Sequence, residues 1–353
     1  MADPPPPCDA WFGPQPMHVV RLGASGFSGS RVFLVERPGL PERFVLKSFA
    51  PHATRRHAAW VHRLMRHLRA EGIGQVPALF DSRCGDRGTL VADADGVLWE
   101  LAAFMSGRPC ERPSIGQATA AADLLARVHI AASSLPGETR PPAPSPGLLR
   151  RSEQARAVLA RPWRDRHAAC RGADDPLVAR LGAAAAIFER MGGANVLERL
   201  ASLEPKPLPL QPVLRDVWSE HVFFGNGPDD AERVTAIVDY HAAGIDTPAT
   251  DLARLFGNWS REDGEECTHL LDAWSGPLAA YDRVRPLGDA ERRLVPVLAS
   301  TAAIFGLDNW FRWTLEERRA FDDAGRVLDR IDRLLAVLAP AIEQAGEAVG
   351  RLN

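Results

Sequence analysis

Two aspartates mark the part of the chain where residue types and spacing are suited to chemistry. Asp216 follows a short apolar run in VLRDVWSEHVFFGNG (213–227), and Asp239 ends the apolar segment TAIVD. Two strand-like runs and a turn of Gly, Asn, Pro and Asp lie between them, which is the pattern of a hairpin. A hairpin would bring both carboxylates to the same end of one cleft. The alternative is structural, with one aspartate as a helix cap and the other as a turn residue.

A glycine-rich segment near the N-terminus is suited to phosphate binding. GASGFSGS contains Gly23, Gly26 and Gly29, and glycine lets backbone N–H groups approach phosphate oxygens closely. A Rossmann loop is followed directly by a helix, and a Walker loop contains Gly-Lys-Ser/Thr. Here the strand-like segment RVFLVE follows instead, so the loop lies between two strands, as in protein kinases. An ordinary tight turn is the other interpretation.

A lysine on the next predicted strand fits the same arrangement. Lys47 interrupts the otherwise apolar segment FVLKSF, where an unpaired charge would be costly. A nucleotide phosphate would supply its partner, whereas the alternative is a lysine exposed on the strand. In kinase-like enzymes a catalytic aspartate and a later metal-binding aspartate follow in this order. The glycine loop, Lys47, Asp216 and Asp239 therefore form one consistent series along the chain.

The segments around these residues predict two lobes. Strand-like runs, one helix over 53–71 and a hairpin with an Asp-Gly turn make residues 17–104 a β-rich N-lobe. Residues 105–353 are mostly helical, contain the catalytic hairpin and form a larger C-lobe. Residues 1–16 are rich in proline and are expected to be loosely ordered. The predicted fold class is α+β, with a small β-rich lobe and a larger helical lobe.

Composition limits the class of protein. The 353 residues are 46% hydrophobic and 25% charged, with a formal net charge of −3, as in an ordinary soluble globular protein. A chain without excess positive charge is not expected to bind nucleic acid. Five scattered cysteines without a CxxC pair predict neither a disulfide framework nor a zinc site. No secretory signal and no apolar run long enough to cross a bilayer is present, so we expect a cytoplasmic protein without a membrane partner.

The segment LRDVWSEHVFF…VTAIVDYHAAGIDTPATDLARL resembles the signature of the aminoglycoside phosphotransferase and choline kinase-like family, which has the protein-kinase-like fold. The resemblance is strongest over residues 213–255. It implies an ATP-dependent phosphotransferase that uses Mg²⁺ and acts on a hydroxyl group of a small-molecule acceptor. Asp216 would be the catalytic base, Asp239 would ligate the metal, and Asp251 would tie the catalytic loop to a helix.

The same resemblance implies a nucleotide site. The residues that would hold the triphosphate of ATP are Gly23, Gly26, Gly29 and Lys47. Backbone groups from Glu100 to Ala102 would hold the adenine edge between the lobes. The acceptor and the oligomeric state are left open, because the resemblance is weakest in the helical lobe and a fold alone does not specify a substrate.

One departure from the family pattern concerns the metal. His221 stands five residues after Asp216, where the family has a metal-binding asparagine. The resemblance then implies that His221 and Asp239 form the metal site. Because neutral imidazole suits softer ions than Mg²⁺, Mn²⁺ is an alternative metal. The other interpretation is that His221 only hydrogen-bonds Asp216.

Two further departures concern the rest of the site. Leu214 replaces the family's histidine, and the helix predicted over 53–71 has no central glutamate to pair with Lys47. Lys47 would then pair with Asp239, or such a pair would be absent. These departures support an alternative hypothesis, a non-catalytic nucleotide-binding module of the pseudokinase type.

Overall fold

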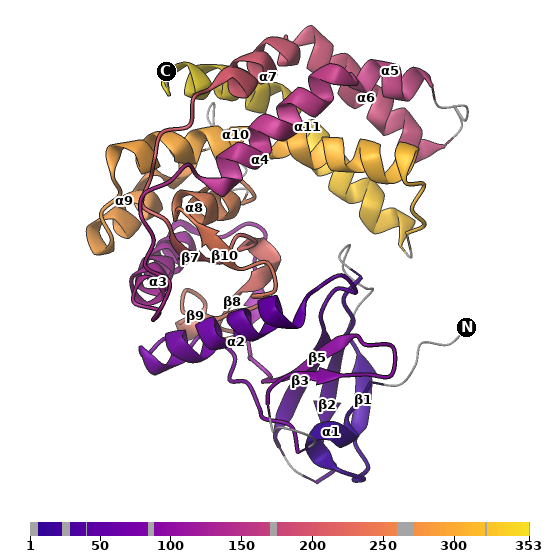
Figure 1. Cartoon of the computed structure of the whole chain (residues 1–353), viewed down its shortest axis with the longest axis vertical. Helices are drawn as coiled ribbons and strands as arrows, with labels where there is room; N and C mark the ends of the chain where they lie inside the picture. Colours follow the sequence, from indigo (N-terminus) through magenta and orange to yellow (C-terminus); the bar gives the residue numbers. More distant parts are fainter. Residues whose placement is uncertain are drawn as a thin grey trace.

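The chain folds into a small β-rich N-lobe and a larger helical C-lobe (Figure 1). The computed structural model describes residues 6–22, 29–39, 41–83, 88–169, 175–259, 271–321 and 323–352. The predicted α+β class with two lobes of unequal size is confirmed.

A five-stranded antiparallel sheet in the order β1–β2–β3–β5–β4 forms the N-lobe. Its strands are β1 (His18–Arg21), β2 (Val32–Glu36), β3 (Arg43–Ser48), β4 (Val91–Ala92) and β5 (Leu98–Ala103). Side chains alternate between the two faces of a strand, so Phe33, Val35 and Leu46 share a buried face. Lys47 therefore lies on the opposite face of the sheet.

The apolar face of this sheet packs against α1 (Asp9–Phe12). Trp11 is buried there with Trp99, and its indole N–H donates a hydrogen bond to the Phe80 carbonyl at 3.0 Å. The expectation of a loosely ordered N-terminal segment is therefore wrong for residues 8–12. An aromatic side chain buries ~150–250 Å² of surface. The burial of Trp11 therefore stabilises a short segment for which the proline content alone predicts little order.

The helix predicted over 53–71 is α2 (Arg55–Ala70). Thr54 caps its first turn, because Thr54 Oγ1 accepts a hydrogen bond from the His57 N–H at 3.2 Å. Its buried apolar residues recur at helical spacing and are Val61, Leu64, Met65 and Leu68. This stripe packs in the same core as α3 (Ile115–Ser133), so α2 connects the sheet with the C-lobe.

Helices form most of the C-lobe. In addition to α3 they are α4 (Pro146–Ala160), α5 (Trp163–Ala168), α6 (Pro176–Arg190), α7 (Gly193–Ser202), α8 (Ala249–Phe256), α9 (Ser275–Val284), α10 (Asp289–Phe311) and α11 (Ala324–Gly350). Short helical turns lie at η1 (Ser219–His221), η2 (Pro228–Asp230) and η3 (Asp272–Trp274), and a π-helix, η4 (Arg312–Glu316), follows α10.

Helix α10 is the central helix of this lobe and contacts α4, α8 and α11. Contrary to the expectation from the sequence, the helical segment Asp289–Glu316, within the described part of the chain, is long and apolar enough to cross a membrane by length and composition. Its most apolar window is 72% buried inside the protein, which is typical of a core helix. The core of the C-lobe therefore forms around α10.

Two short sheets in the C-lobe carry the candidate site. One contains β6 (Arg108–Pro109), β8 (Val222–Phe224) and β9 (Val234–Ile237), and the other pairs β7 (Gln211–Val213) with β10 (Gly244–Asp246). The predicted hairpin is the antiparallel pair β8–β9.

Candidate active site

The hairpin places both candidate aspartates at the same end of the β8–β9 pair. Val222, which begins β8, lies opposite Ile237, which ends β9. The loop with Asp216 comes just before this end, and Asp239 comes just after it. Both aspartates line one cavity of about 450 Å³, as the hairpin pattern predicts.

Lys47 reaches this cavity region from the N-lobe and pairs with Asp239. Its Nζ lies 2.6 Å from Asp239 Oδ1, and the two side chains are 12% and 33% exposed. Burial raises the pKa of Asp239, but the positive charge of Lys47, its hydrogen bond and the nearby His241 outweigh burial and hold that pKa well below its usual range. Of the two alternatives for Lys47, the structure therefore shows the pair with Asp239.

The carboxylate of Asp216 is held by one arginine from α8. Asp216 Oδ1 accepts hydrogen bonds from Arg254 Nε at 3.1 Å and from Arg254 Nη2 at 2.7 Å. Both side chains are about one third exposed, at 36% and 34%. Within the described part of the chain, Oδ2 of Asp216 has no hydrogen-bond donor. One oxygen is therefore fixed, and the other is available to an acceptor hydroxyl.

Asp251, in α8, anchors the loop that carries Asp216. Its carboxylate accepts the backbone N–H groups of Leu214 at 2.7 Å and Arg215 at 2.6 Å, and it pairs with His129 Nε2 at 3.0 Å. The role expected for Asp251, tying the loop to a helix, is confirmed. Because Leu214 takes part through its backbone N–H, the family's histidine is not needed for this tie.

His221 lies beside Asp239, but both of its ring nitrogens are already hydrogen-bonded. Nδ1 donates to the backbone carbonyl of Asp216 at 2.6 Å, and Nε2 accepts from the indole N–H of Trp218 at 3.0 Å. Because an indole nitrogen only donates, His221 must be neutral and carry its proton on Nδ1. Nε2 is 3.7 Å from Asp239 Oδ2, so a metal bound at Nε2 would have to replace the bond from Trp218.

The donor set fits a metal that arrives with a nucleotide. Mg²⁺ is commonly bound by one or two carboxylates together with phosphate oxygens of the substrate, and Asp239 provides such a carboxylate. Among the described residues, no group of three or more His, Cys, Asp or Glu side chains could hold a metal ion. The described residues therefore do not form a metal site of their own.

The glycine loop connects β1 and β2, as predicted. The Leu22 N–H donates to the Val32 carbonyl at 2.9 Å, which joins the two strands at the base of the loop. Gly29 has φ of +77°, a conformation that favours glycine. Gly23 and Gly26 lie outside the described residues.

The register of β5 does not fit the nucleotide role expected for Glu100 and Ala102. Glu100 lies directly opposite Lys47, and Ala102 lies two residues further along the same ladder. The Phe49 N–H donates to the Leu98 carbonyl at 2.8 Å, and hydrogen-bonded pairs alternate along an antiparallel ladder. The backbone groups of Glu100 and Ala102 therefore point to β3 and are used within the sheet, not at an adenine edge.

The side chain of Glu100 instead forms a buried cluster with two histidines. Its carboxylate accepts from His62 Nε2 at 2.6 Å and from His241 Nε2 at 3.1 Å. Burial raises the pKa of Glu100, but the charges and hydrogen bonds of His241 and His62 outweigh burial and hold that pKa well below its usual range. The ring of Phe49 stacks on His241 at 3.7 Å. This cluster ties α2 and β5 to the segment after Asp239, although α2 has no central glutamate.

The cavity continues into the C-lobe, where residues of α8, α10 and α11 line it. Its charged or aromatic lining residues on this side are Trp218, Glu220, Arg254, Trp310, Trp313, Arg326 and Arg330. A second hollow of about 280 Å³ adjoins it at Asp216 and Arg254 and reaches toward α4. The C-lobe side of the cavity is therefore rich in arginine.

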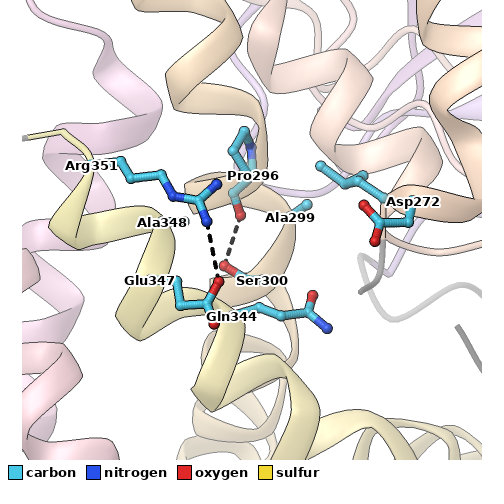
Figure 2. A pocket seen from close by; sticks show the side chains of 9 residues that line it. Asp272, Pro296, Ala299, Ser300, Gln344, Glu347, Ala348 and Arg351 are labelled. Atoms are coloured by element: carbon cyan, nitrogen blue, oxygen red, sulfur yellow. Dashed lines mark hydrogen bonds and ion pairs between the residues drawn. The ribbon is translucent and has the colours of Figure 1, made fainter. Parts of the chain in front are cut away.

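Another hollow, of about 270 Å³, lies between α10 and α11 (Figure 2). Its polar side chains are bonded to nearby protein groups. Arg351 pairs with Glu347 at 3.3 Å, and the Ser300 hydroxyl donates to the Pro296 carbonyl at 2.7 Å. None of the candidate catalytic residues lines this hollow.

Comparisons with known proteins agree with this geometry. The model of the phosphotransferase enzyme family (APH) matches residues 19–287. A homoserine kinase from Brucella anthropi is 26% identical over 291 residues, which cover 82% of this chain and 78% of that protein. Another homoserine kinase, from Gluconobacter oxydans, is 26% identical over 273 residues and covers 76% of each chain.

Solved structures show the same fold at low sequence identity. An aminoglycoside phosphotransferase from Alicyclobacillus acidocaldarius has a TM-score of 0.55 and 16% identity, covering 99% of this chain and 96% of that one. The family match and the named kinases favour the catalytic interpretation over the non-catalytic alternative. The chain therefore belongs to the phosphotransferase enzyme family and is an ATP-dependent phosphotransferase that acts on a hydroxyl group of a small molecule.

Proposed function

We propose that Asp216 is the catalytic base and that Asp239 ligates the metal that accompanies ATP. One observation carries this proposal: the Lys47–Asp239 ion pair, at 2.6 Å, lies beside the cavity that Asp216 lines. The N-lobe lysine and the two C-lobe aspartates thus meet around one space, in the order expected of a kinase-like enzyme.

Asp216 would orient the acceptor hydroxyl and receive its proton. Arg254 holds Oδ1, so the unpartnered Oδ2 is the atom that accepts the hydroxyl proton. General base catalysis of this kind contributes about 10²–10⁴-fold in rate.

Lys47 would stabilise negative charge on the transferred phosphoryl group. An ammonium has three donors, so Nζ can contact phosphate oxygens while it keeps its pair with Asp239. Backbone N–H groups of the glycine loop would hold the triphosphate from the other side. A bound Mg²⁺ would neutralise charge on the phosphate oxygens. The protein's own contribution is positioning and charge stabilisation.

The first acceptor to test is L-homoserine. The Brucella anthropi relative is named as a homoserine kinase and covers 82% of this chain. Mg²⁺ is the metal that the single carboxylate of Asp239 suits, and Mn²⁺ is the alternative to test beside it.

The decisive variant is Asp216→Asn, which keeps the shape of the side chain and removes its basicity. We expect kcat to fall by about 10²–10⁴-fold, while the Kd for Mg²⁺·AMP-PNP, measured by calorimetry, stays at the parental value. Asp229→Asn is the matched control, because Asp229 is an exposed aspartate in η2 that does not line the cavity. A parental kcat in Asp216→Asn would remove Asp216 from the mechanism.

A further inference from the structure

Each carboxylate that lines the described part of the cavity has a cationic partner. The ion pairs are Lys47–Asp239 at 2.6 Å, Arg254–Asp216 at 2.7 Å and Arg326–Glu220 at 3.1 Å. These pairs use every carboxylate that lines the cavity. Arg330 remains, since no ion pair or hydrogen bond joins it to any residue that the structure describes. Of the three arginines that line the described part of the cavity, Arg330 is thus the one without a carboxylate within ion-pair distance.

Arg330 is held in a defined orientation by an aromatic ring. Its guanidinium carbon lies 4.0 Å from the centroid of the Trp218 ring. A guanidinium stacked in this way still has its N–H donors at the edge of its plane, where they can bind a carboxylate with two parallel hydrogen bonds. Burial and the positive charges of Arg254 and Arg333 lower the pKa of Arg330 to about 10, and the negative charges of Glu220 and Asp216 offset only part of this effect. Arg330 therefore stays cationic at neutral pH. A bound anion would stabilise this positive charge.

Trp218 connects this arginine to the catalytic loop. It lies two residues after Asp216, and its indole N–H is bonded to His221 Nε2 at 3.0 Å. Its ring also lies 5.6 Å from the guanidinium carbon of Arg254, the partner of Asp216. A ligand anion bound by Arg330 would therefore lie in the same cavity as the carboxylate that receives the hydroxyl proton.

We infer that Arg330 binds a carboxylate of the acceptor, so that the acceptor is a small hydroxy acid. This inference rests on the proposed phosphotransferase function. A polycationic aminoglycoside, or an amino alcohol without a carboxylate, would add positive charge beside a guanidinium that has no direct ion pair with any described carboxylate. The cavity of about 450 Å³ is also at the small end of ligand sites.

The test compares acceptors that have a carboxylate with cationic acceptors that have none. ADP formation and phosphorylated product are measured with four acids, L-homoserine, L-serine, 4-hydroxybutyrate and D-glycerate, and with three cations, choline, 3-amino-1-propanol and kanamycin. We expect turnover with one or more acids and none with the cations. For the best acid, the alcohol in which the carboxylate is reduced should be a much poorer acceptor, because it cannot pair with Arg330.

Arg330→Gln tests the residue itself. A hydrogen-bonded charge contact of this kind corresponds to a rise of about 10- to 100-fold in the KM of the acid, with the KM for ATP unchanged. Arg330→Lys should recover only part of the loss, because lysine keeps the charge but not the planar fork. Arg333→Gln is the matched control on the same helix, since Arg333 pairs with Glu111 at the surface.

Each contrary outcome has a separate meaning. Preferred turnover of a cation overturns the inference and leaves the phosphotransferase function standing. A rise in the KM for ATP alone in Arg330→Gln has the same meaning, because it would assign Arg330 to nucleotide binding. If no compound is phosphorylated, the proposed function fails, and calorimetry of the acids with Mg²⁺·AMP-PNP bound still decides the inference. Acid binding that is lost in Arg330→Gln supports it, and no acid binding overturns it.

Discussion

The two sides of the cleft differ in how completely their charges are matched. On the N-lobe side, Lys47 pairs with Asp239, and Glu100 receives hydrogen bonds from two histidines. On the C-lobe side, the Asp216–Arg254 pair is about one third exposed, and Arg330 stacks on Trp218 without a direct ion pair to any described residue. Buried ion pairs hold a site in one geometry before the ligand binds. A cation without an ion-pair partner can instead bind an anionic group of the ligand. The proposed nucleotide side is therefore preorganised, and the proposed acceptor side keeps a cation that can select the ligand.

Asp239→Asn should produce the largest change on the preorganised side. The substitution removes the proposed metal carboxylate and leaves Lys47 without its 2.6 Å partner. Removing one partner of a hydrogen-bonded charge pair costs roughly 2–5 kcal/mol, and we expect a loss of this size in the binding of Mg²⁺·AMP-PNP, measured by calorimetry. Binding of the acid acceptor should change little. Calorimetric curves that overlay those of the parent would show that Asp239 does not hold the nucleotide.

Glu100→Gln should have an intermediate effect on the same side. The amide cannot accept strong hydrogen bonds from both His62 and His241, so α2 is held less firmly against the segment after Asp239. We expect a loss of about 1–3 kcal/mol in the free energy of unfolding and a rise in the KM for ATP without a matching rise for the acceptor. Thermal unfolding and steady-state kinetics measure the two effects. Equal changes in both KM values would mean that the cluster serves stability alone.

The pH dependence of the stability that Glu100 contributes has a defined sign. Because the pKa of Glu100 is lower in the folded protein than its ordinary value of 4.5, its ionised form stabilises the fold fully above that value. This contribution is lost as the pH falls through the lower, folded pKa. The difference in Tm between the parent and Glu100→Gln should therefore narrow as the pH is lowered below 4.5. A difference that widens in acid would contradict an ionised Glu100.

Features fixed by neighbouring residues could be predicted from the sequence. The glycine loop between strands, the helix α2 and the hairpin that joins the two aspartates all depend on local alternation and turn residues. The adenine-edge prediction failed, because which backbone groups remain free depends on how β5 pairs with β3 and on where β5 ends, at Ala103. The pattern of neighbouring residues in β5 does not specify how β5 pairs with β3.

The side-chain partners of the site could not be predicted in the same way. Arg254 and Arg330 come from α8 and α11, far from Asp216 along the chain, and are ordinary polar residues of helices in the sequence. Trp218 is the one neighbouring residue that indicates such a partner, because a large aromatic side chain two positions after the proposed catalytic aspartate needs another side chain to pack against. Glu100 offers a weaker signal, because it is a carboxylate inside the apolar segment LWELAAF.

His221→Asn should give the smallest effect and tests where the two sides meet. His221 uses Nε2 to hold the indole of Trp218, so its loss should loosen Trp218 and the stacked Arg330. We expect a rise of a few-fold in the KM of the acid acceptor, corresponding to about 1 kcal/mol. The ratio of activity with Mg²⁺ to activity with Mn²⁺ should not change.

Trp218→Phe is the matched variant for this last prediction, because it keeps an aromatic ring and removes only the N–H that His221 accepts. If His221 acts through Trp218, both variants raise the acceptor KM alike and neither alters the metal ratio. If His221 is instead a metal ligand, His221→Asn alone changes the ratio, since asparagine provides an oxygen that suits Mg²⁺ better than imidazole. The second result would assign His221 to the nucleotide side. Arg330 would then select the acceptor without a contribution from His221.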